Sequence, residues 1–138
     1  MKIFDLKEFG FILDGWFLGQ TSETCNDVCD KNSLSCSEDQ QMAFNSDVDS
    51  SDKVITIVQS LGGLISSPPC KDDGYGANDD VPNIGGNVCY YSRGSRALST
   101  FSCSRNPGPD KQRLCYCFSN SKPQGDSYVM KLSNPTLN

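Results

Sequence analysis

The sequence predicts an α+β fold: a small disulfide-rich domain in which two or three helices are followed by a small antiparallel sheet. The chain has 138 residues, eight cysteines and no histidine. Its first half holds amphipathic stretches that begin at capping residues, which is typical of helices. Its last third holds short runs of β-branched and aromatic residues between turn formers, which is typical of strands. Helices first and strands later indicate an α+β domain.

The N-terminal region is expected to be extended. Phe9, Phe11 and Leu13 alternate with other residues, as side chains on one face of an extended segment do. The bulky cluster of residues 15–19 is expected to end this segment, with Trp16, the only tryptophan, as a core anchor. Charged residues interrupt the apolar ones, so we find no apolar core of a signal peptide here.

The first helix is expected to run to about Leu34, with Thr21 or Ser22 as its N-cap. Cys25 and Cys29 are four residues apart on this helix and therefore share one face. One helical face thus offers two positions for cross-links.

A second amphipathic helix is expected to begin within residues 50–52 and to end at the glycines 62–63. Between the two helices, residues 38–44 predict a short helical turn. The buried stripe of the second helix follows the i, i+3, i+4, i+7 pattern. Its members are Val54, Ile57, Val58 and Leu61.

The remaining chain predicts one long loop and then strands. Residues 66–86 are acidic, contain two adjacent prolines and show no periodicity, so a loop is expected. Residues 88–91, 98–103 and 113–118 are predicted strands. Residues 128–132 are expected to form a fourth strand or part of an arm.

The eight cysteines have three interpretations, and structural disulfides are favoured. A zinc site usually shows two C-x2-4-C pairs or a pair of histidines, whereas Cys115-x-Cys117 is too tight and histidine is absent. A redox dithiol is normally C-x-x-C in a thioredoxin-like context. An even number of cysteines spread over about ninety residues is typical of a disulfide framework. Such frameworks occur in oxidising environments: outside the cell, on a particle surface, or in a secretory or organelle lumen.

The charge of the chain is unevenly distributed. Residues 1–80 hold 15 acids and 5 bases, a net of −10, and residues 81–138 hold 2 acids and 7 bases, a net of +5. The overall charge of −5 argues against nucleic acid as a partner. No run approaches the length of a membrane span. Five bases are expected to face the acidic half, a partner protein or solvent: Arg93, Arg96, Arg105, Lys111 and Arg113.

The order and spacing of the cysteines carry a more specific resemblance. The pattern is Ser22-x2-Cys25-x2-Val28-Cys29-x4-Leu34-x-Cys36, then Cys70, Cys89 before an aromatic residue, Phe101-Ser102-Cys103-Ser104 and Gln112-Arg113-Leu114-Cys115-Tyr116-Cys117. Over about residues 16–118 it resembles the cysteine-rich C-terminal module of N-acetylglucosaminyltransferase V, the Golgi enzyme family that adds a β-1,6 branch to N-glycans. All eight cysteines have counterparts in the same order.

The resemblance implies a disulfide pairing that spacing alone leaves open. It pairs Cys25 with Cys115, Cys29 with Cys117, Cys36 with Cys103, and Cys70 with Cys89. It also suggests three parts: an extended arm (1–15), the disulfide-rich domain (16–118) and a C-terminal arm (119–138). Glycosyl transfer is not implied, because the transferase performs it in a separate, larger domain.

The residues themselves suggest no catalysis and no cofactor. The chain lacks histidine, a glycine-rich phosphate loop and G-x-S-x-G. Asp47-x-Asp49-x-Ser51 begins like a calcium loop, but Asp52 replaces the required glycine and Val58 the required glutamate. The acidic residues in 71–80 lie in a loop, so we expect them to be solvated, with a loosely held cation as the alternative.

The sequence therefore predicts a non-enzymatic structural or protein-interaction module, a disulfide-stapled subunit of a larger extracellular, virion or lumenal assembly. The alternative is a carbohydrate-binding module, since exposed aromatic rings can stack on sugars, although strand alternation is expected to bury about half of them. Neither the partner nor the oligomeric state follows from the sequence. The candidate contacts with a partner or glycan are Trp16, Tyr75, Tyr90, Tyr91, Arg93 and Arg96, with Tyr116 as a further aromatic residue.

Overall fold

The structure is a computed structural model that describes residues 13–120. These residues form three α-helices and a four-stranded antiparallel sheet with four disulfides, which confirms the predicted fold class. Most of the two proposed arms lies outside the described residues, and so does the segment 128–132. No helix within residues 13–120 has the length and apolar character needed to cross a bilayer.

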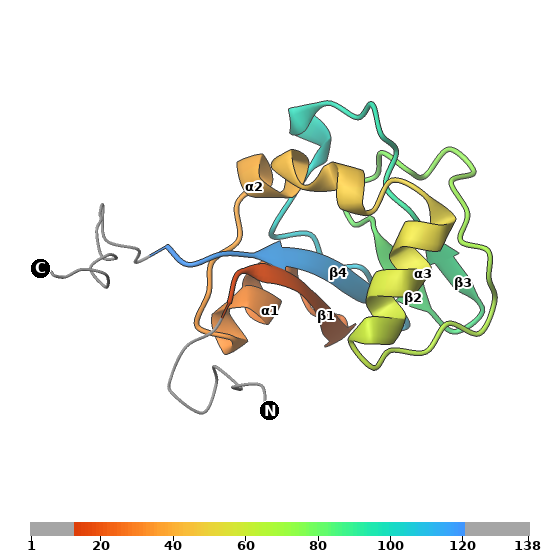
Figure 1. Cartoon of the computed structure of the whole chain (residues 1–138), viewed down its shortest axis with the longest axis horizontal. Coiled ribbons are helices and arrows are strands. Elements are labelled where there is room, and N and C mark those ends of the chain that lie inside the picture. The colour runs from red at the N-terminus through yellow and green to blue at the C-terminus, as the bar shows by residue number, and fades with distance from the viewer. Residues whose placement is uncertain (1–12, 121–138) are drawn as a thin grey trace, which may run out of the picture.

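The sheet joins the first and last strands of the described chain. Its order is β1-β4-β2-β3, so β1 and β3 are the edge strands (Figure 1). β1 is Gly15–Thr21 and β4 is Gln112–Cys117. β2 is Asn83–Gly85 and β3 is Val88–Tyr90, and these two short strands form a hairpin. β1 thus precedes the helices and pairs with β4, the last strand of the described chain.

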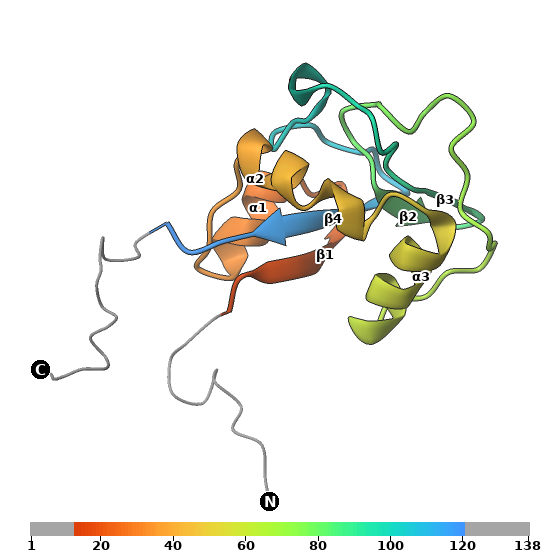
Figure 2. The same ribbon diagram turned by 45° about the horizontal axis from the view of Figure 1, so that its top comes forward.

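Helices cover both faces of the β1–β4 pair. Figures 1 and 2 show α1 on one side of the β1–β4 pair, with α2 and α3 on the other. α1 is Cys25–Lys31, α2 is Glu38–Ala43 and α3 is Ser51–Ser60. Two 3-10 helices, η2 (Asn45–Asp47) and η3 (Leu98–Thr100), lie in the connections.

Alternation along β4 creates two cores, one on each face of the sheet. Cys115 and Cys117 pack against α1, whereas Leu114 packs against α3, because successive strand residues point to opposite faces. The core on the α1 side consists of Cys25, Val28, Cys29, Leu34, Cys103, Cys115 and Cys117. The core on the α3 side consists of Val48, Val54, Val58, Cys70, Ile84, Cys89 and Leu114.

The four disulfides have the pairing that the resemblance implied. Cys25 bonds to Cys115 and Cys29 to Cys117, with Cα separations of 5.5 and 5.3 Å. Two cysteines one helical turn apart thus meet two cysteines on one face of β4. The other two bonds join Cys36 to Cys103 and Cys70 to Cys89.

The first helix begins later than the sequence predicted. Its N-cap is Thr24 and neither Thr21 nor Ser22. The Thr24 hydroxyl accepts a hydrogen bond from the backbone N–H of Asp27, and the Asp27 carboxylate accepts one from the backbone N–H of Thr24. This reciprocal capping box satisfies two donors at the helix start, and the helix ends at Lys31, about one turn earlier than expected.

The second amphipathic helix agrees closely with its prediction. Ser50 caps α3 by accepting a hydrogen bond from the backbone N–H of Lys53 at 3.3 Å. The helix ends before Gly62, whose φ of +83° favours glycine. Leu61 differs from the prediction, because it is the C-cap and is 40% exposed. The short predicted turn between the helices is confirmed as α2.

The segment 98–103 is not a strand, contrary to the prediction. Leu98–Thr100 form η3, and the carbonyl and hydroxyl oxygens of Thr100 both accept hydrogen bonds from the buried Arg96. The side chain of a residue just upstream therefore holds this segment in a turn. Phe101 is buried beneath the same guanidinium, 3.9 Å from ring centroid to Cζ.

Two further predictions about extended segments are corrected. The cluster at residues 15–19 does not end a strand but forms most of β1. The long loop predicted at residues 66–86 ends in β2, and Gly86 and Asn87 make the tight turn to β3. Gly86 has a φ of +43°, which suits glycine in a two-residue hairpin turn.

Candidate functional site

The predicted aromatic contacts divide into two groups. Trp16 and Tyr116 are cross-strand partners with ring centroids 5.5 Å apart, and Tyr116 also stacks on Phe44 at 4.0 Å. Tyr116 is buried, which raises the pKa of its phenol, with smaller contributions from two nearby aspartates. Tyr91 packs partly buried against the α3-side core. These three residues therefore belong largely to the interior.

Tyr75 and Tyr90, in contrast, meet at the surface. Their ring centroids lie 5.3 Å apart in an edge-to-face arrangement, and Tyr75 is 50% exposed. Tyr75 comes from the loop before β2, and Tyr90 is the last residue of β3. Loop and hairpin thus bring together two aromatic residues that are 15 positions apart in the sequence.

The two tyrosines form the walls of a concavity of about 170 Å³, which we call the tyrosine cleft. Asn83 lies directly opposite Tyr90 in the β2–β3 hairpin and also lines the cleft. The Lys111 ammonium lies 5.1 Å from the centroid of the Tyr90 ring. The remaining polar residues of the lining are Asn78 and Asp80.

Asn83 is the unusual member of the tyrosine cleft. The residue is 1% exposed, and its Nδ2 donates a hydrogen bond to the Asp80 carbonyl at 2.9 Å. Its Oδ1 has no hydrogen-bond partner within the described residues. A buried acceptor without a donor costs about 1–3 kcal/mol. Asn83 therefore adds a buried, unpaired acceptor to the residues that line the cleft.

The two predicted arginine contacts have different environments. Arg96 is 6% exposed, and its guanidinium donates to the carbonyls of Asn78 and Val81 at 2.9 and 3.0 Å. Burial lowers the pKa of Arg96 to about 10. Arg93 is partly exposed and pairs with Asp72 at 3.4 Å. Arg96 thus holds the loop behind the tyrosine cleft, whereas Arg93 lies at the surface.

Acidic and basic halves of the chain face each other at two ion pairs. Besides Arg93 with Asp72, Arg105 pairs with Asp79 at 3.4 Å. Arg113 is fully buried and donates to the carbonyls of Ser102 and Arg105, and burial lowers its pKa to about 10. The expectation that these bases face the acidic half is confirmed for Arg93 and Arg105.

Two aspartates of the acidic loop have arginine partners. Asp72 and Asp79 of this loop make the ion pairs described above. Within residues 13–120 no cluster of three or more histidine, cysteine, aspartate or glutamate side chains has metal-binding geometry.

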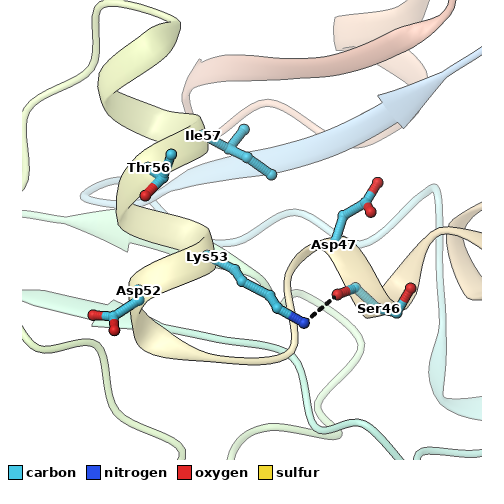
Figure 3. Close-up of a pocket in the computed structure, with 6 residues that line it drawn as sticks. All are labelled: Ser46, Asp47, Asp52, Lys53, Thr56 and Ile57. Atoms are coloured by element: carbon cyan, nitrogen blue, oxygen red, sulfur yellow. Dashed lines mark hydrogen bonds between the residues drawn. The ribbon is translucent and has the colours of Figure 1, made fainter.

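A hollow of about 460 Å³ lies between η2 and α3 (Figure 3). Figure 3 shows Lys53 reaching from α3 towards η2, where its ammonium donates to the Ser46 carbonyl at 2.9 Å. Asp47, on the same wall, accepts a hydrogen bond from the Trp16 indole at 3.0 Å. Lys53 and Asp47 therefore already have hydrogen-bond partners within the fold.

The outer edge of β1 is a third surface feature. Leu114 of β4 donates its N–H to the Pro82 carbonyl, on the side away from β1. Leu18, which lies opposite Leu114, therefore belongs to a non-hydrogen-bonded pair, and its own N–H and C=O point away from β4. The same holds for Trp16, two residues earlier. Within the described residues, neither backbone has a hydrogen-bond partner on that outer side.

Sequence reasoning missed Asn83 and Asn78 as members of a site, and it considered Asp80 only as an acidic loop residue. A signal was present: Gly86-Asn87 between short apolar runs predicts a two-residue hairpin loop. That loop fixes the register and places Asn83 opposite Tyr90. The approach of Tyr75 and Lys111 depends on tertiary packing and has no comparable signal.

Comparisons with protein-family models and with curated protein sequences find no match. The four intramolecular disulfides indicate a small domain of an oxidising compartment. What the chain does is therefore inferred from its three surface features: the tyrosine cleft, the hollow between η2 and α3, and the edge of β1.

Proposed function

We propose that the chain is a non-enzymatic interaction module, a disulfide-stapled subunit of a larger extracellular, virion or lumenal assembly. The observation that carries this proposal is the edge of β1. Seven residues, Gly15–Thr21, form an edge strand without a charged residue or proline. Natural proteins usually protect edge strands with such residues, because an open edge pairs readily with another chain.

The backbone of β1 suits a partner that adds a strand. The N–H and C=O groups of Trp16 and Leu18 point outwards, and strand addition uses such groups for affinity. The disulfides support the same function, because Cys25 and Cys29 fix α1 to the strand next to β1. A prearranged edge loses little conformational entropy when a partner binds.

Binding experiments with matched variants test this proposal. Leu18→Pro removes an outward N–H and keeps the ladder to β4, whereas Leu18→Ala shortens the side chain and keeps the N–H. The oxidised chain serves as bait in protein extracts prepared from its natural source. A partner retained by Leu18→Ala and lost with Leu18→Pro is expected. Retention by both variants, or capture of nothing beyond a reduced and unfolded control, contradicts the proposal.

Hydrogen exchange provides a second readout on the complex. The amides of Trp16 and Leu18 are expected to exchange fast in the free chain and slowly in the complex. The amide of Phe17 belongs to a hydrogen-bonded pair with Cys115 and is expected to be slow in both. Unchanged exchange at Trp16 and Leu18 in a purified complex would place the partner elsewhere.

We also propose that the chain is related to the cysteine-rich module of N-acetylglucosaminyltransferase V and lacks the transferase activity. The shared order of eight cysteines and the identical spacing at Cys25, Cys29 and Cys36 support this proposal. A determined structure of that module with a different strand order would contradict it.

A carbohydrate-binding module is the second candidate, and one observation favours it. Tyr75 and Tyr90, two of the six predicted contacts, meet in a concave site beside Asp80 and Asn83. Aromatic faces next to carboxylate and amide groups suit sugars, which have apolar faces and a rim of hydroxyls. A glycan array probed with the oxidised chain tests this candidate, and binding to no glycan would contradict it.

A further inference from the structure

We propose that the tyrosine cleft binds one neutral sugar ring, with Tyr75 as the stacking surface and Asn83 as the buried hydrogen-bond acceptor. This inference rests on the carbohydrate-binding candidate and names its site and ligand class. Three properties of the cleft carry it: its size, the unpaired acceptor and the balance of charge.

The size of the cleft limits the ligand to a single small ring. Its volume of about 170 Å³ is well below the range of about 300–1,000 Å³ that is typical of pockets for drug-sized ligands. Tyr75 is half exposed and meets Tyr90 edge to face, so an apolar ring face has an aromatic surface to cover. The cleft is too small for a long apolar chain or a peptide segment.

The unpaired acceptor selects a ligand with hydrogen-bond donors. Asn83 is buried at the cleft, and its Nδ2 is already committed to the Asp80 carbonyl, which fixes the orientation of the amide. Its Oδ1 has no donor within residues 13–120. A hydroxyl group that reaches this oxygen removes the cost of the unpaired acceptor. The Asp80 side chain is a second acceptor in the lining, and adjacent acceptors suit adjacent hydroxyls.

The charges of the lining favour a neutral ligand. Lys111 and Asp80 bring one positive and one negative side chain into the same small cleft. The carboxylate of Asp80 repels an anionic ligand, and the ammonium of Lys111 repels a cationic one. A neutral polyhydroxylated ring accepts a hydrogen bond from Lys111 and donates one to Asp80, so it uses both charges. Among small rings that carry both an apolar face and several hydroxyls, a pyranose fits best.

An NMR titration of the full oxidised chain tests the proposal. The probes are the methyl glycosides of glucose, galactose, mannose and N-acetylglucosamine, and the variants are Tyr75→Ala, Tyr75→Phe and Asn83→Leu. At least one glycoside is expected to bind with a millimolar dissociation constant. Shifts are expected at the backbone amides of Tyr75, Asn83 and Tyr90 and at the Asn83 side-chain amide. Leu64→Ala, at an 89% exposed position outside the cleft lining, is the control and is expected to bind as the wild type does.

The variants separate the roles of ring and acceptor. Tyr75→Ala is expected to weaken binding at least about tenfold, whereas Tyr75→Phe keeps the ring and most of the affinity. Asn83→Leu removes the acceptor at similar volume, and its unperturbed amide spectrum elsewhere will show that the fold persists. Sugar binding that is unchanged in Tyr75→Ala and Asn83→Leu would overturn the cleft assignment and leave the carbohydrate candidate standing. Absence of binding to all four glycosides and to the glycan array would overturn both.

Discussion

Cys25 and Cys115 are 90 residues apart in the sequence, yet a disulfide holds their Cα atoms 5.5 Å apart. Cys29 and Cys117 form a second bond one helical turn away, across 88 residues. Both bonds close nearly the same long loop. Whichever bond remains after the other is removed still joins α1 to β4, so their contributions to stability cannot be independent.

We predict that the stability contributions of these two disulfides are non-additive. Replacing Cys25 and Cys115 by alanine leaves the long loop closed by the second bond and opens only a loop of a few residues, so the expected loss is about 2 kcal/mol. Removing the second bond as well opens a larger loop, of the 7 residues from Cys29 to Cys36 and the 14 from Cys103 to Cys117, because Cys36–Cys103 still closes the rest. The same chain-entropy treatment gives a further loss of about 3 kcal/mol. Urea unfolding of the single and double pair variants measures both steps.

The Cys70–Cys89 bond is the control for this prediction. It closes a separate loop of 19 residues, and its removal by two alanine substitutions is expected to cost about 3 kcal/mol whether or not Cys25–Cys115 is present. Equal losses on removal of the first and second α1–β4 bonds would contradict the shared-loop account.

The capping box of α1 gives the second prediction. Thr24→Ala removes the oxygen that accepts from the Asp27 N–H and is expected to lower the free energy of unfolding by about 1 kcal/mol. Thr21→Ala, at the alternative cap position, is expected to change it by less than about 0.5 kcal/mol, because Thr21 is an exposed residue at the end of β1. Thermal or urea unfolding of the two variants decides between the caps. A larger loss for Thr21→Ala would favour the cap that the sequence suggested.

Local signals explain which elements were predictable from the sequence. α3 has a serine cap, an apolar stripe and a terminal glycine, all of which agree, and its bounds follow closely. At α1 several hydroxyl residues compete for the cap, and only the acidic residue three positions after Thr24 distinguishes it. The two-residue loop at Gly86 was an available signal for a hairpin, but the long acidic loop before it obscured that signal.

The remaining differences come from tertiary contacts. The segment 98–103 has strand-like residues, but Arg96 binds both oxygens of Thr100 and fixes a turn there. Nothing in the spacing shows that an arginine will be buried. The tyrosine cleft has the same origin, because Tyr75 reaches Tyr90 only after the loop folds against the hairpin. The sequence therefore predicted the set of aromatic candidates, but it did not predict that Tyr75 and Tyr90 would be the two that come together at the surface.

Arg96 gives the third prediction. Its guanidinium makes five hydrogen bonds, to Val81, Asn78, Ser92 and both oxygens of Thr100. Lysine cannot match this planar set of donors, so Arg96→Lys leaves buried carbonyls unpaired and is expected to cost about 3 kcal/mol of stability.

Arg93→Lys is the matched control for that substitution. Arg93 is a partly exposed arginine paired with Asp72, and the expected loss is below about 0.5 kcal/mol. Calorimetric unfolding of both variants measures the difference. A loss at Arg96 as small as that at Arg93 would contradict the interior role assigned to Arg96.

Tyr116 gives a prediction about alkaline pH. Burial raises the pKa of its phenol, and the charges of Asp14 and Asp47 raise it further. In the unfolded chain the phenol loses its proton near pH 10, whereas the folded protein retains it to higher pH. Above about pH 10 the unfolded state thus binds fewer protons than the folded state, so stability falls as pH rises. Below that pH both states are protonated, and Tyr116 adds no pH dependence.

Tyr116→Phe isolates this effect. It keeps the ring that packs on Trp16 and Phe44 and removes the ionisable group. Arg96 and Arg113, whose pKa values are lowered to about 10, act in the opposite direction, but they are present in both proteins and cancel in the comparison. The stability of the variant relative to the wild type is expected to stay constant from pH 7 to 9 and to rise above about pH 10. A constant difference up to pH 11 would mean that the phenol ionises equally well in the folded protein, and hence that the Tyr116 hydroxyl is open to water.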